Sequence, residues 1–178
     1  MKNIKWTNFN INSRKTTVFG SSLDEKLFIK IELKKNPKKN FDVDSEYDVI
    51  KFLNERNAVT APRAHEKGVL TYSDLEKILE EEYLMHFQKD QEYQFMITDF
   101  IPHSENYNIS DVMFSMIEQK NLGVFQGDIK PDNIRYDSKS CVCYIVDYDQ
   151  AIFLNEEQKI LNAKQFFDFC SQYDKEKF

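Results

Sequence analysis

Four polar residues in the last third of the chain have types and spacing that suit chemistry. Asp128, Lys130 and Asn133 fall within one short loop, which precedes a predicted strand hairpin of residues 134–146. Asp147 directly follows that hairpin. Because a hairpin returns the chain to the place where it began, we expect the loop and Asp147 to lie close together. Two carboxylates, an amide and an ammonium group would then meet in one place.

This set of side chains suits a reaction at a phosphate group that is bound to a divalent cation. Mg²⁺ prefers hard oxygen ligands supplemented by substrate phosphates, and the side chains of Asn133 and Asp147 offer such oxygens. Asp128 could accept a proton from a hydroxyl group or orient that group as a nucleophile. Lys130 would neutralise negative charge on a phosphoryl group during its transfer.

The N-terminal part is predicted to contain strands and a helix that carries an unusual acid. In Leu27–Leu33, alternation places Lys30 on the face opposite the aliphatic residues. Val43–Asn57 has apolar residues at helical spacing, and Glu46 falls on the same stripe. A carboxylate that faces a core needs a partner, because burying an unpaired charge is costly. Such a break in the pattern makes Glu46 a functional candidate.

Together these residues resemble sequence elements of the protein-kinase superfamily. The run Asp128–Asn133 reads D-I-K-P-D-N and is similar to the catalytic loop of that family, D-x-K-P-x-N. Val146–Asp149 reads V-D-Y-D and is similar to the metal-binding D-F-G element. The chain is also similar to lipopolysaccharide-core and other small-molecule kinases. The resemblance covers about residues 10–155 and implies an enzyme that uses ATP and Mg²⁺.

The resemblance also implies a role for each matching residue. Asp128 would act on the acceptor hydroxyl, and Lys130 would assist at the γ-phosphate. Asn133 and Asp147 would hold the metal ion.

Further resemblances lie in the N-terminal part. Lys30 stands where the family has the lysine of its V-A-I-K element, so it would bind the α- and β-phosphates and pair with Glu46. Met96–Ile101 resembles the hinge between the two lobes of a kinase, which makes Asp99 and Ile101 candidates for ATP binding.

The sequence departs from the family pattern at several positions. The loop expected to cover the phosphates, Asn12–Thr17, has no glycine, and Arg14 and Lys15 could compensate with positive charge. Gln126 occupies the usual histidine position. Asp149 replaces the usual glycine and could join the metal site.

Composition narrows the class of protein. The 178 residues are 41% hydrophobic and 30% charged, which is typical of a globular domain. The net charge of −6 disfavours nucleic acid as a partner. Three cysteines without a framework spacing indicate a reducing compartment. No apolar run is long enough to span a membrane, and no signal peptide is evident. We therefore expect a cytoplasmic protein, with export as an effector left open.

We expect an α+β, two-lobed protein-kinase-like fold with a small antiparallel-sheet N-lobe and a truncated, mostly helical C-lobe. It would form one minimal domain over residues 1–178, with the N-lobe at about 1–97, the hinge at 98–102 and the C-lobe at 103–178. The preferred function is phosphorylation of a Ser or Thr hydroxyl on a protein. The alternatives are a sugar or lipopolysaccharide-core kinase and an inactive pseudokinase that acts as a binding module. The sequence leaves the oligomeric state open.

Three local expectations complete the prediction. Tyr83–Phe87 and Tyr93–Ile97 would form a hairpin. A capping box that starts at Ser73 would open a helix. Residues 155–173 would form one amphipathic helix.

Overall fold

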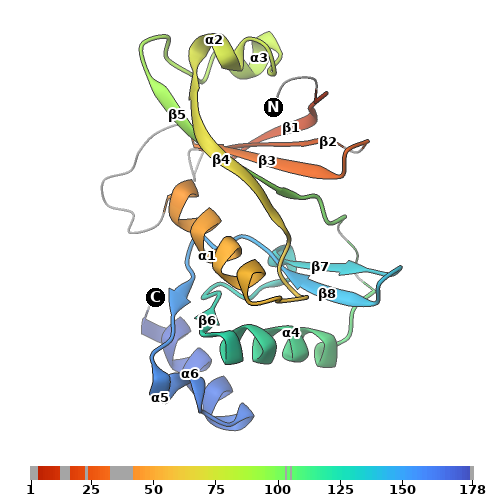
Figure 1. Ribbon diagram of the computed structural model, residues 1–178, viewed down its shortest axis with the longest axis vertical. Helices are drawn as coiled ribbons and strands as arrows, with labels where there is room; N and C mark the ends of the chain where they lie inside the picture. Colours follow the sequence, from red (N-terminus) through yellow and green to blue (C-terminus); the bar gives the residue numbers. More distant parts are fainter. Residues whose placement is uncertain are drawn as a thin grey trace. The chain divides into compact units, whose positions relative to one another are not determined.

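The computed structural model describes residues 4–12, 17–22, 24–32, 42–102, 104 and 106–176. The chain divides into two compact units. Unit 1 contains Met1–Tyr47 and Arg63–Phe100, and unit 2 contains Asp48–Pro62 and Ile101–Phe178. Figure 1 follows the elements in chain order from red to blue.

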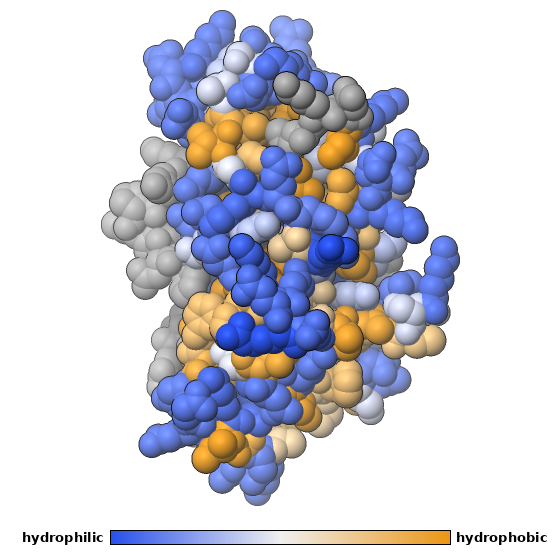
Figure 2. All heavy atoms as spheres, in the orientation of Figure 1, coloured by the Kyte–Doolittle hydropathy of each residue, from blue (hydrophilic) through white to orange (hydrophobic). Residues whose placement is uncertain are grey.

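Hydrophilic residues dominate the face drawn in Figure 2. The large apolar side chains that are exposed come from separate elements, among them Met85, Ile109 and Ile160. Scattered apolar residues of this kind are normal on protein surfaces. None of the helices in the described ranges combines the length and apolar character that crossing a membrane requires.

Unit 1 is built on a five-stranded antiparallel sheet with the order β1-β2-β3-β5-β4 (Figure 1). Its strands are β1 (Thr7–Asn12), β2 (Thr17–Ser22), β3 (Leu27–Glu32), β4 (Ala64–Thr71) and β5 (Glu92–Asp99). The central strand β3 pairs Lys30 with Phe19 on one side and with Met96 on the other. This central place buries Lys30 although it is charged.

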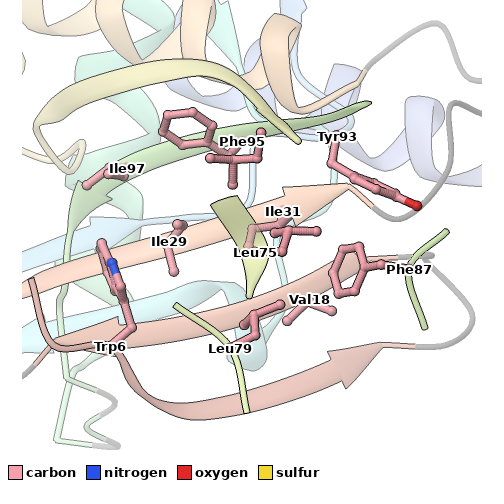
Figure 3. Packing of buried hydrophobic residues seen from close by; sticks show 11 residues of the cluster. Trp6, Val18, Ile29, Ile31, Leu75, Leu79, Phe87, Tyr93, Phe95 and Ile97 are labelled. Carbon is pink, nitrogen blue, oxygen red and sulfur yellow. The ribbon is translucent and has the colours of Figure 1, made fainter. Parts of the chain in front are cut away.

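One face of the sheet carries the apolar core of unit 1 (Figure 3). Ile29 and Ile31 share this face because alternate residues of a strand point to the same side. Two short helices, α2 (Tyr72–Leu75) and α3 (Glu81–Leu84), add Leu75 and the partly buried Leu84. Each fully buried side chain of this kind contributes about 1.5–3 kcal/mol to stability.

The predicted hairpin of residues 83–87 and 93–97 is wrong. Residues 93–97 lie in β5, which pairs with β3 on one side and with β4 on the other. Residues 83–87 instead belong to α3 and the turns after it. A short apolar run fits a strand or a buried helical segment equally well by pattern alone. Here Phe87 packs edge-on against Tyr93, with ring centroids 4.8 Å apart.

The start of α2 also differs from the prediction. The capping box begins at Thr71 rather than at Ser73, because the Thr71 hydroxyl and backbone N–H both donate to Asp74 Oδ2, at 2.7 and 3.1 Å. Leu75 and Leu79 are buried and belong to the apolar core of unit 1.

Helix α1 (Val43–Glu55) matches the helix predicted from the apolar stripe. The stripe is buried and consists of Val43, Tyr47, Ile50 and Leu53. The Asp42 carboxylate lies at the start of the helix and accepts hydrogen bonds from the Ser45 N–H and hydroxyl, each at 2.9 Å. The Asp42 carboxylate therefore accepts from one of the backbone N–H groups that a helix leaves unpaired at its beginning.

Unit 2 combines helices with two small sheets. Helix α4 (Ile109–Leu122) begins at Asn108, whose side chain accepts from the Asp111 N–H at 3.0 Å. It ends at Gly123, where φ is +96°, a conformation that glycine adopts without a Cβ penalty. The pairs are β6 (Val124–Phe125) with β9 (Ile152–Phe153) and β7 (Ile134–Asp137) with β8 (Val142–Ile145).

The single helix predicted for residues 155–173 is two helices, α5 (Glu156–Lys159) and α6 (Ala163–Glu176). Asn162 and Gln165 form a capping box, in which each side-chain oxygen accepts from the backbone N–H of the other residue, at 3.0 and 3.1 Å. This capping box marks the end of the segment between α5 and α6 and the start of α6. The α+β class expected from the sequence is confirmed.

Candidate active site

A short loop in unit 2 holds Asp128 in a network of hydrogen bonds. Lys130 Nζ lies 2.5 Å from Asp128 Oδ2. Asn133 Nδ2 donates to the same oxygen at 3.1 Å and to the Asp128 carbonyl at 2.9 Å. A 3₁₀ turn, η1 (Pro131–Asn133), follows Lys130 and ends at Asn133. Asn133 is buried, whereas the Asp128 side chain stays 24% exposed, so the carboxylate is held in place and still reachable.

The β7–β8 hairpin brings Asp147 to this loop. Ile134 of β7 is paired with Ile145 of β8. The N–H of Val146 donates to the carbonyl of Asn133 at 2.9 Å, and Asp147 is the next residue. The loop and the strand end therefore meet within unit 2, as the hairpin predicted.

Asp147 has a backbone conformation that residues with a side chain rarely adopt. Its φ is +61°, in the left-handed region. Backbone outliers of this kind concentrate at functional sites, where the surrounding structure holds them. The next residue, Tyr148, is fully buried, and Gln119 Nε2 donates to its hydroxyl at 2.8 Å.

Asn133, Asp147 and Asp149 are the residues predicted to offer oxygen ligands to a divalent cation. Because the Asn133 amide donates through its nitrogen to Asp128, its oxygen is the atom suited to a cation. In the part of the chain that is described, no three His, Cys, Asp or Glu side chains gather into a metal cluster. The predicted donors, two carboxylates and one amide oxygen, are hard oxygen ligands of the kind that Mg²⁺ takes, with phosphate and water oxygens completing its shell.

The sequence reasoning missed a positive charge close to these acids. Arg135 follows Asn133 by two residues and donates from Nη1 to the carbonyls of Asp132 and Ile134, at 2.7 and 2.9 Å. Burial lowers the pKa of the Arg135 guanidinium, and the charges of Asp132 and Asp147 oppose that shift. Arg135 stays charged and offsets part of the local negative charge. The sequence signal that could have identified Arg135 was its position in the predicted strand directly after the loop.

Lys30 and Glu46 form a buried ion pair within unit 1. Lys30 Nζ lies 2.5 Å from Glu46 Oε2, and the two side chains are only 4% and 2% exposed. Strand β3 places Lys30 on the face opposite Ile29 and Ile31, which belong to the apolar core. Glu46 thus has the partner that its place on an apolar stripe required. The role of this pair toward a nucleotide remains a prediction.

Asp99, at the end of β5, makes its contacts within unit 1. Its carboxylate accepts from the Arg63 N–H at 3.2 Å and lies 2.6 Å from His65 Nε2. Its own N–H donates to the Arg63 carbonyl at 3.0 Å. Its carbonyl accepts from the Thr98 hydroxyl at 3.4 Å. The ATP-binding role of Asp99 stays a prediction.

Ile101 is the one remaining predicted ATP-binding residue among those that the structure describes. The N–H of Phe100 donates to the Lys26 carbonyl at 2.8 Å, which ties the end of unit 1 to its sheet, and Ile101 follows as the first residue of a segment of unit 2. Arg14 and Lys15 lie outside the described residues.

Comparison with known proteins supports the fold. No family model and no curated protein matches the chain. Among solved structures, the chain is similar to the kinase PK-1 of Cydia pomonella granulovirus, with a TM-score of 0.51 and 15% sequence identity. The match covers 84% of this chain and 52% of that kinase, so the chain spans about half of its length. The protein therefore has a protein-kinase-like α+β fold, as the sequence resemblance implied.

Proposed function

We propose that this protein is an ATP- and Mg²⁺-dependent phosphotransferase of the protein-kinase-like class, which phosphorylates a Ser or Thr hydroxyl on a protein. The observation that carries the proposal is the Asp128 network of unit 2. A partly exposed carboxylate contacts Lys130 and Asn133, and the backbone of Asn133 is bonded to the residue before Asp147. A base, a cation and metal-binding oxygens are the groups that phosphoryl transfer requires.

In the proposed reaction Asp128 accepts the proton of the acceptor hydroxyl while the oxygen of that hydroxyl bonds to the γ-phosphorus. The bond between the γ-phosphorus and the β–γ bridging oxygen breaks, and ADP leaves with the electron pair. Lys130 offsets negative charge on the transferring group. Bound Mg²⁺, held by Asn133, Asp147 and Asp149, would neutralise charge on the phosphate oxygens.

The proposal also assigns residues to ATP binding. Lys30 would contact the α- and β-phosphates, and the buried ion pair with Glu46 supports this role because it fixes the ammonium group. The proposed ATP-binding residues are Lys30, Glu46, Asp99, Ile101, Arg14 and Lys15. In the same proposal, residues 1–97, 98–102 and 103–178 serve as the N-lobe, the hinge and the C-lobe of one kinase-like domain.

The acceptor class rests on two opposing observations. The lysine of the D-x-K-P-x-N pattern, Lys130, favours a protein acceptor because protein kinases carry it. Against this, Asp149 stands where the family pattern has a glycine, so the segment ends in D-x-D. The extra carboxylate of Asp149 favours a sugar or lipopolysaccharide-core acceptor as the second candidate.

The test is phosphoryl transfer from ATP labelled at the γ-phosphate, with and without Mg²⁺, in the presence of cell extract. We expect labelled protein from the wild type and roughly 100-fold less from Asp128→Asn, which removes the proposed base. Asp147→Asn should lose the same activity through its metal ligand. Asp132→Asn is the matched control, because its exposed carboxylate lies in the same loop and has no assigned role.

The fate of the label distinguishes a protein kinase from a sugar kinase and from a pseudokinase. Label in protein that depends on Asp128 and Asp147 supports the protein kinase. Label that appears in a glycan fraction instead replaces the protein acceptor with a sugar. If wild type and variants neither bind nor turn over ATP, the chain is a pseudokinase and the proposal is wrong.

A further inference from the structure

Gln126 is a buried side chain that joins the two candidate catalytic segments of unit 2. It is 2% exposed. Its Oε1 accepts a hydrogen bond from the N–H of Asp128 at 2.7 Å. Its Nε2 donates to the carbonyls of Val146 and Asp147, at 3.0 and 2.5 Å. One side chain therefore contacts the backbone of both acids.

The chemistry of these partners fixes the orientation of the Gln126 amide. A backbone N–H can only donate and a backbone carbonyl can only accept. The oxygen must therefore face Asp128, and the nitrogen must face Val146 and Asp147. An amide rotated by 180° would lose all three hydrogen bonds.

The contact with Asp147 lies where the backbone is strained. The two carbonyls that Gln126 binds belong to the residue before Asp147 and to Asp147 itself, and the φ of Asp147 is +61°. A non-glycine residue in this region costs of order 1–3 kcal/mol and persists only where surrounding contacts hold it. The Gln126 amide is such a contact, because it bonds to the carbonyls on both sides of the strained residue.

Few side chains could take the place of Gln126. The site uses two donors and one acceptor on a single planar group, and only a carboxamide supplies that set without charge. A neutral imidazole offers one donor and one acceptor, so histidine could make two of the three hydrogen bonds at most. Methionine is similar in length and makes none of them.

We propose that Gln126 is a positioning residue that holds the Asp128 amide and the strained Asp147 backbone in fixed register for phosphoryl transfer. The inference rests on the proposed kinase activity. Gln126 touches neither substrate in this account and acts only through the two acids. Loss of the amide should therefore lower the rate of the chemical step more than it weakens ATP binding.

The experiment compares Gln126→Met and Gln126→His with the wild type by steady-state kinetics. We expect kcat to fall roughly 10- to 100-fold in Gln126→Met, while KM for ATP changes less. Gln126→His should recover part of the lost kcat, because imidazole restores some of the hydrogen bonds. The control is Ser115→Ala, which removes another buried hydrogen bond from a side chain to a backbone carbonyl, that of Cys143 at 2.6 Å. It should leave kcat unchanged.

A second readout does not depend on activity. Amide hydrogen exchange at Asp128 should be roughly tenfold faster in Gln126→Met, because its N–H loses its acceptor, and unchanged in Ser115→Ala. Exchange and kcat that both stay at wild-type values in Gln126→Met overturn the inference. A wild type without ATP turnover overturns the proposed function instead. In that case exchange alone decides whether Gln126 holds the loop, and an unchanged rate at Asp128 rejects this role.

Discussion

Lys30 and Glu46 meet across 16 residues of sequence, with Lys30 Nζ 2.5 Å from Glu46 Oε2 and both side chains almost fully buried. Taking two charges out of water is costly, and their attraction repays that cost only when the pair is complete. A core built for stability alone would have no need of this pair. Its presence is expected if the ammonium group must be held ready for a ligand of opposite charge.

Breaking this pair should destabilise unit 1. Replacing one partner, as in Lys30→Met or Glu46→Gln, leaves the other without its ion pair, and the free energy of unfolding should fall by about 3–5 kcal/mol. In the double variant Lys30→Met/Glu46→Met, the loss of unfolding free energy should be smaller than the sum of the losses in Lys30→Met and in Glu46→Met. Urea denaturation measures these values. Strictly additive losses would contradict a coupled pair.

The buried hydroxyl of Tyr148 should contribute measurably to the stability of unit 2. It accepts from Gln119 Nε2 at 2.8 Å, and Tyr148→Phe removes this acceptor while it preserves the ring. We expect a loss of about 0.5–1.5 kcal/mol in the free energy of unfolding. Tyr144→Phe, at a partly exposed position of β8, is the control and should change little. Equal effects in the two variants would show that the hydrogen bond to Gln119 contributes nothing.

Acid should weaken the capping box of α2. Hydrogen bonds from the Thr71 hydroxyl and from Lys77 lower the pKa of Asp74 from 3.8 to about 2. A group with a lowered pKa stabilises the folded state fully above its unfolded value and loses that effect as the pH falls through its folded value. The difference in unfolding free energy between wild type and Asp74→Asn should therefore shrink from about pH 4 to pH 2. A difference that stays constant over this range would contradict the assignment.

The three cysteines should differ sharply in reactivity. Cys141 is exposed, whereas Cys143 and Cys170 are buried. Burial also raises the pKa of the Cys143 thiol, which lowers the fraction of reactive thiolate. Iodoacetamide applied to the folded protein should modify Cys141 first, as read by mass spectrometry, and Cys141→Ser should abolish the fast reaction. Equally fast labelling at Cys143 would show that β8 opens readily.

The sequence pattern predicted elements well where periodicity was strong. Helix α1 was predicted because four apolar residues repeat at helical spacing, and all four are buried. Strand β4 was missed because it lies at the sheet edge and buries only Leu70, which leaves no alternation to detect. The run at residues 83–87 was misread because five residues are too few to separate a strand from a helical turn.

The candidate site, too, could be predicted only in part from the sequence. The meeting of Asn133 with the residues beside Asp147 followed from hairpin geometry alone. The hydrogen bonds of the Gln126 amide could not be predicted from the sequence, because they depend on the directions of two carbonyls and on the left-handed backbone of Asp147. Neither property has a signature in the order of residues.

The most direct test of the central claim is the affinity for ATP measured by calorimetry with and without Mg²⁺. Wild type should bind ATP more tightly with Mg²⁺, and Asp147→Asn should lose this enhancement because a proposed metal ligand is gone. Asp128→Asn should keep the enhancement, since the role proposed for Asp128 is at the acceptor hydroxyl and not at the metal ion. An affinity for ATP that is indifferent to Mg²⁺ in the wild type, or that Asp147→Asn leaves unchanged, would contradict the account.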